Sequence, residues 1–120
     1  MGATLAVALL TGCSSASTTI QDALDQVHTA GSSVSLAADL NDGAGLPKAA
    51  LDTSTVDAVA EISDAESTLA ELEPAPSEAD ARDDALDRIR DVEDAVLAVQ
   101  ATGSRAARDA LDSALDRLSE

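Results

Sequence analysis

The chain has 120 residues, which is enough for one small domain. It carries 23 acidic and 7 basic residues, and the resulting net charge of -16 repels nucleic-acid phosphates and anionic lipid surfaces. Because the sequence contains no Phe, Tyr or Trp, base-stacking platforms, aromatic sugar-binding surfaces and interfaces centred on Trp or Tyr are excluded as well.

An uncharged apolar run, Ala-Thr-Leu-Ala-Val-Ala-Leu-Leu, opens the chain at residues 3–10. It is too short to cross a bilayer, which takes about 20 residues in a helix, but it has the length of a signal-peptide core. The only cysteine, Cys13, follows, and a polar stretch of Ser, Thr and Ala comes directly after it at residues 14–19. A lone cysteine excludes an internal disulfide, so another role has to be sought for it.

Residues 10–13, Leu-Thr-Gly-Cys, resemble the bacterial lipobox, in which an aliphatic residue and two small residues precede an obligatory cysteine. In lipoproteins the sulfur of that cysteine receives a diacylglyceryl group, and cleavage leaves the cysteine as the first residue. The resemblance therefore implies a signal peptide at residues 1–12, a lipidated Cys13 with a polar tether at 13–19, and a folded domain at 20–120.

The composition, the lipobox and the helical pattern together resemble small Ala-, Asp- and Arg-rich lipoproteins of high-GC Gram-positive bacteria. The resemblance implies a lipid-anchored position on the extracytoplasmic face of the bacterial cell membrane, and it transfers no functional residue. Met1 and Gly2 supply no Lys or Arg ahead of the apolar run, which leaves open a true start upstream. The alternative interpretation is an apolar helix start at residues 3–12 that precedes a cysteine by chance. Myristoylation is excluded, since Ala6 stands where Ser or Thr is needed.

The first helix is expected from about residue 18 to residue 40. Its apolar residues recur at steps of four and three, which is the period of a helix facing a partner. Gly31 lies on this seam, where it allows a neighbour to approach closely or marks a bend. The sequence Asn-Asp-Gly-Ala-Gly at residues 41–45 ends the helix. The seam consists of Ile20, Leu24, Val27, Gly31, Val34 and Ala38.

A second helix is expected to begin near Pro47 or at Ser54, where Ser-Thr-Val-Asp resembles a variant capping box. The sequence Glu-Pro-Ala-Pro at residues 73–76 ends it. Its expected seam is Val56, Val59, Ile62, Ala65, Leu69 and Leu72.

Ser77 is the expected cap of a third helix, with Leu86, Ile89, Val92, Val96 and Val99 as its seam. Residues 77–118 form either one helix or two. The change of step near Gly103 favours two, with Ser104 capping the second. The seam of that last helix is Ala107, Leu111, Ala114, Leu115 and Leu118.

The fold class that follows is all-α: a small antiparallel bundle of three to four helices, with a disordered or helical signal segment at the amino terminus. After Cys13 the chain has 22 Leu, Val and Ile residues, about a fifth of its length. That fraction is the border at which a highly charged chain is expected to be disordered. The helical spacing and the 26 alanines favour the folded state.

Acidic residues recur on one face of the third helix, and they have two interpretations. They could bind a divalent cation such as Ca²⁺, which takes several carboxylate oxygens. The favoured interpretation is a solvated face, partly neutralised by Arg82, Arg88 and Arg90, so no metal site is predicted. A second candidate, the sequence from Asp39 to Gly43, starts like a calcium loop, but Ala50 stands where the loop needs Glu, so an EF-hand is excluded. The acidic stripe is Asp80, Asp84, Asp87, Asp91 and Asp94, with Asp83 beside it.

Catalytic residues are not predicted. His28 is the only histidine, and a metal site or a catalytic triad needs partners that the sequence does not supply. With no phosphate-binding glycine loop either, neither enzymatic activity nor a cofactor is expected. The expected function is a non-enzymatic, membrane-anchored lipoprotein that serves as a structural or protein-interaction module of the cell envelope, with no nucleic-acid partner. The alternatives are an acidic cation-binding envelope protein and a self-associating coiled-coil spacer.

Overall fold

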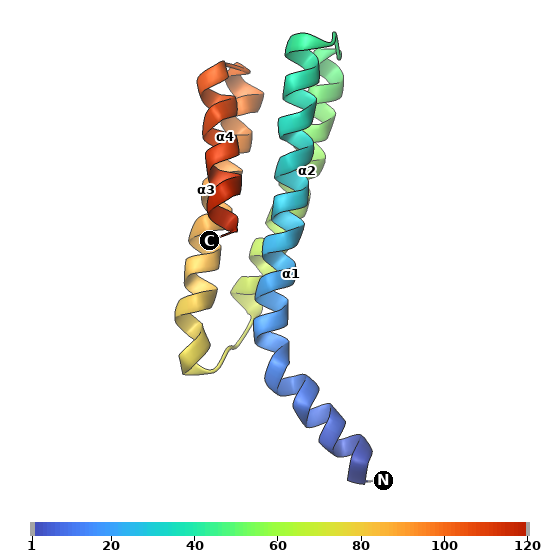
Figure 1. The fold of residues 1–120 in the computed structure, drawn as a ribbon, viewed down its shortest axis with the longest axis vertical. Coiled ribbons are helices and arrows are strands. Elements are labelled where there is room, and N and C mark those ends of the chain that lie inside the picture. Colours follow the sequence, from blue (N-terminus) through green and yellow to red (C-terminus); the bar gives the residue numbers. More distant parts are fainter. Residues whose placement is uncertain (1, 120) are drawn as a thin grey trace.

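The computed structural model describes the backbone of residues 2–119 and the side chains of residues 16–119. Within this range the chain is entirely helical apart from short connections, and successive helices run in opposite directions (Figure 1). The predicted all-α antiparallel bundle is therefore confirmed, with four helices. These are α1 (Gly2–Gly43), α2 (Lys48–Glu71), α3 (Pro76–Thr102) and α4 (Arg105–Leu118).

The two central helices are α1 and α3, because each of them packs against all three other helices. Over the described residues α2 and α4 do not meet, so they lie on opposite sides of the central pair. With 14 residues, α4 is much shorter than α3, which has 27. It therefore covers only that half of the bundle in which the α1–α2 turn lies, and α1, α2 and α3 alone form the other half (Figure 1).

Alanine supplies much of the core. Among the described side chains 24 apolar residues are buried, and ten of these are alanines. Small side chains let helix axes approach closely, which compensates in contact for the absence of large aromatic rings. Every residue of the seams predicted for the third and fourth helices is buried, so both predictions are confirmed.

Gly31 lies where α1 approaches α3 and α4. A Cβ atom at this position would lie 2.6 Å from Leu115 Cδ2 on α4 and 3.2 Å from Val92 Cγ1 on α3. Both distances are shorter than ordinary contacts between side-chain carbons. Of the two interpretations of Gly31, close approach of a neighbour is the correct one, and α1 continues through this residue as helix.

The predicted buried face of α2 is partly wrong. Val56 is 60% exposed, while Val59 and Leu72 are only half-buried. The helix is rotated so that Thr55 lies in the core, where its hydroxyl donates to the Leu51 carbonyl at 2.9 Å. This hydrogen bond within the helix satisfies the hydroxyl and makes its burial possible. The buried face is Leu51, Thr55, Ala58, Ile62, Ala65 and Leu69, again at steps of four and three.

Two of the three predicted helix caps are wrong. Pro47 and Ala75 precede α2 and α3, neither supplies a side-chain cap, and Ser54 and Ser77 lie inside the helices. Pro76 begins α3 instead, because its fixed φ suits the first helical position and its missing N–H is not needed there. The third cap is confirmed, since Ser104 Oγ accepts a hydrogen bond from the Ala107 N–H at 3.1 Å.

Two glycine-containing turns end helices as expected. Beyond α1, which extends past residue 40 to Gly43, the Leu46 N–H donates to the Leu40 carbonyl at 3.0 Å, and Gly45 adopts a positive φ of 77°. Gly103, with a φ of 59°, ends α3 and donates its N–H to the Val99 carbonyl. Residues 77–118 therefore belong to two helices, which resolves that alternative.

We predict that Gly31→Val destabilises the bundle by about 1–3 kcal/mol, because a branched side chain overpacks the contact with Leu115 and Val92. Urea unfolding followed by circular dichroism measures this loss. Gly43→Ala is the matched control, since a Cβ atom there meets open space. Equal stability losses in the two variants would contradict the close approach at Gly31.

We predict that Ser104→Ala lowers the free energy of unfolding by about 1 kcal/mol, the usual cost of losing a helix N-cap. The same unfolding experiment measures it. Ser113→Ala, at an exposed position inside α4, is the control and should be close to neutral. A neutral Ser104→Ala variant would show that the cap contributes nothing to α4.

Candidate functional site

The predicted lipidation site lies just ahead of the bundle. The side chain of Cys13 is outside the described residues, and its backbone belongs to α1. Ile20 is the first buried apolar residue among the described side chains. Core contacts therefore begin seven residues after Cys13, at the position where the folded domain was predicted to start. The lipidation of Cys13 and the tether at 13–19 stay predictions.

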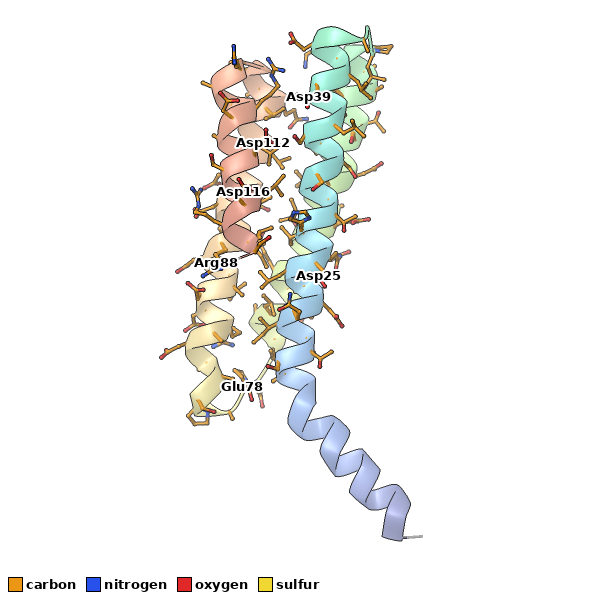
Figure 2. The ribbon with its side chains drawn as sticks, in the orientation of Figure 1. Asp25, Asp39, Glu78, Arg88, Asp112 and Asp116 are labelled. Carbon is orange, nitrogen blue, oxygen red and sulfur yellow. The ribbon has the colours of Figure 1, made fainter. Side chains whose placement is uncertain are left out.

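The largest surface depression is a shallow groove of about 350 Å³ between α1 and α4. Leu36 and Leu115 provide its apolar part, and carboxylates and hydroxyl groups surround them. Asp39 on α1 and the two aspartates of α4 lie along this side of the molecule (Figure 2). The groove is lined by His28, Ser32, Ser35, Leu36, Asp39, Asp112, Leu115 and Asp116.

The groove contains Ser, His and Asp side chains, but their geometry is not that of a catalytic triad. Ser35 Oγ donates to Asp112 Oδ1 at 2.7 Å, so this carboxylate holds a serine and does not orient the imidazole. His28 Nδ1 lies 3.5 Å from Ser32 Oγ, one turn along the same exposed helix face. A triad requires one acid, one imidazole and one nucleophile in a single chain of hydrogen bonds. These contacts join α1 to α4 and order the surface.

Arg108 closes the upper end of this groove. Its guanidinium Nη1 lies 3.5 Å from Asp39 Oδ1 and 3.4 Å from Asp42 Oδ2, so one largely buried cation pairs with two carboxylates from the last turns of α1. The pairing joins the start of α4 to the end of α1. The lower part of the groove, at Asp112 and Asp116, has carboxylates facing an apolar floor, which suits a cationic side chain of a partner.

The acidic stripe of α3 is exposed along its whole length. Three of its carboxylates form ion pairs with the arginines named in the sequence analysis: Asp83 with Arg82 at 2.7 Å, Asp84 with Arg88 at 2.9 Å and Asp87 with Arg90 at 3.7 Å. Among the residues the structure describes, no three His, Cys, Asp or Glu side chains are grouped so that they could hold a metal ion. The candidate calcium loop from Asp39 to Gly43 forms the last helical turn of α1.

A pair of acidic residues that sequence reasoning missed lies between α2 and α3. Glu66 and Glu93 each follow a core residue, and burial together with the Glu93 carboxyl raises the pKa of Glu66 to about 7. Residues that flank the seam of paired helices commonly contact across it. This rule could have found the pair if the rotation of α2 had been predicted correctly.

Comparison with known proteins gives no relative: no family model, no curated protein and no solved structure matches the chain. As for the bilayer, none of the helices, over the described residues, combines the length and the apolar character that crossing one requires.

We predict that salt stabilises the fold, because the net charge of -16 makes the exposed carboxylates repel one another. Raising the ionic strength from about 0.01 M to about 1 M shortens the screening length from about 30 Å to about 3 Å. The melting temperature, followed by circular dichroism, should rise over this range of NaCl. A melting temperature that is unchanged or falls would show that ion pairs outweigh the repulsion.

Proposed function

We propose that the protein is a non-enzymatic lipoprotein, anchored through Cys13 to the extracytoplasmic face of a bacterial membrane, whose helical bundle is a protein-interaction module of the cell envelope. The observation that carries the proposal is the single cysteine in the sequence Leu-Thr-Gly-Cys, after an apolar run and ahead of the bundle. A diacylglyceryl group with further acylation supplies two or more chains, and more than one chain is what durable attachment requires.

The geometry of the bundle supports an interaction role. Its acidic groove between α1 and α4 combines apolar floor residues with the carboxylates of Asp112 and Asp116. Positive groups on a partner complement such a surface and accelerate association. The His, Ser and Asp side chains of the groove lack the order that nucleophilic catalysis needs, which favours binding over chemistry.

The test is the distribution of the full chain between membrane and soluble fractions of a bacterial host. The wild-type protein should stay with the membranes after a high-salt wash and come off in detergent, because lipid chains hold it and a highly acidic surface does not bind anionic lipid. The Cys13→Ser variant should move to the soluble fraction. Mass spectrometry of the mature amino terminus should show acyl chains on Cys13.

Ser14→Ala is the matched control and should stay in the membrane fraction, since it leaves the cysteine intact. A wild-type protein found entirely in the soluble fraction would refute the anchor. Membrane retention of the Cys13→Ser variant would refute it equally, and would assign attachment to the bundle itself or to a protein partner.

A further inference from the structure

Two carboxyl side chains meet at the edge of the contact between α2 and α3. Glu66 follows Ala65 on α2, and Glu93 follows Val92 on α3; the alanine and the valine are both fully buried. Each glutamate is therefore held beside the core by its neighbour, and the two side chains lie within hydrogen-bonding reach of each other. Neither side chain is fully exposed.

Glu66 Oε1 is buried and has no hydrogen-bond partner. Two ionised carboxylates only accept hydrogen bonds, so neither can donate to the other. One proton changes this, because a carboxylic acid donates an O–H to the facing carboxylate and one negative charge disappears. The arrangement lacks a single donor, and a shared proton supplies it, as in other closely spaced carboxyl pairs.

The charged groups that act on Glu66 all come from α3. Burial has the largest effect, followed by the hydrogen bond and the charge of Glu93, and these raise its pKa to about 7. Arg90 lowers the pKa and Asp94 raises it further. On the other helix that packs against α2, the polar link is neutral, since the Gln26 amide donates to the Glu61 carbonyl.

We propose that Glu66 and Glu93 form a proton-operated latch between α2 and α3, which holds the helices together while the pair keeps one proton and loosens when that proton is lost. The folded state binds this proton more tightly than the unfolded chain, in which Glu66 has its ordinary value of 4.5. The stabilisation is therefore complete below about pH 4.5 and is lost as the pH rises through about 7. The latch responds to a change from mildly acidic to mildly alkaline surroundings.

The test compares thermal unfolding and backbone hydrogen exchange at about pH 5.5 and about pH 8.5, with exchange corrected for its intrinsic dependence on pH. In the wild-type protein the melting temperature should fall by several degrees between these conditions. Amide protection should decrease most in the facing stretches 62–69 and 89–96. Carbon-13 NMR of the Glu66 carboxyl should titrate with a midpoint near 7.

Glu66→Gln and Glu93→Gln should both abolish the pH dependence, because an amide at either position donates to its partner at every pH. Glu61→Gln, an exposed change on the same helix, should retain it. His28→Asn should also retain it, which separates the latch from the only imidazole, a group type that changes charge in the same range. The proposal is wrong if the wild-type melting temperature does not change with pH, or if Glu66→Gln keeps the full dependence.

Discussion

The fold depends on how closely α1 can approach α3 and α4 at Gly31. No aromatic residue is present to fill space, so apolar contact has to come from Leu, Val, Ile and Ala at short distances between helix axes. Gly31 has the least bulk of any residue at the point where Val92 and Leu115 press against α1. A glycine inside a helix lowers its intrinsic stability by about 1 kcal/mol relative to alanine, and the packing of two helices offsets this cost. The same packing has to overcome the mutual repulsion of a strongly acidic chain.

The few cations stand where segments have to be joined. Arg108 joins the start of α4 to the end of α1, and Arg88 donates to the Arg117 carbonyl at 2.9 Å, which attaches the last turn of α4 to α3. Arg82 donates to the Leu72 carbonyl at 3.0 Å and so secures the α2–α3 connection. Two of these three guanidiniums bond carbonyl groups at helix ends, which lack partners within their own helix. A small supply of positive charge thereby stabilises the connections of the bundle as well as its acidic faces.

Helix count, direction and most of the core could be predicted from the sequence, because the apolar residues of α1, α3 and α4 recur at an unbroken helical period. The rotation of α2 could not, since the valine at 56 looks like a core residue and Thr55 does not. Only the hydrogen bond from Thr55 to the Leu51 carbonyl shows why a hydroxyl is buried there. The caps at Ser54 and Ser77 failed for a related reason, because each motif lies inside a helix whose start Pro47 or Pro76 determines. The Glu66–Glu93 pair depends on that rotation too, and local sequence patterns carry no information about which side chains face each other across helices.

The length of α4 makes the two halves of the bundle unequal in cooperativity. Where α4 is present, a local opening has to separate four helices that share one core, and the bond from Arg88 to Arg117 marks the end of that region. Beyond it, α1, α2 and α3 form a thinner unit with fewer layers of side chains to break. Openings of different free energy within one small domain are the physical basis of partial unfolding units. The protein therefore has a graded mechanical profile, with a firm half at the α1–α2 turn and a softer half at the α2–α3 connection, towards the end from which α1 enters the bundle.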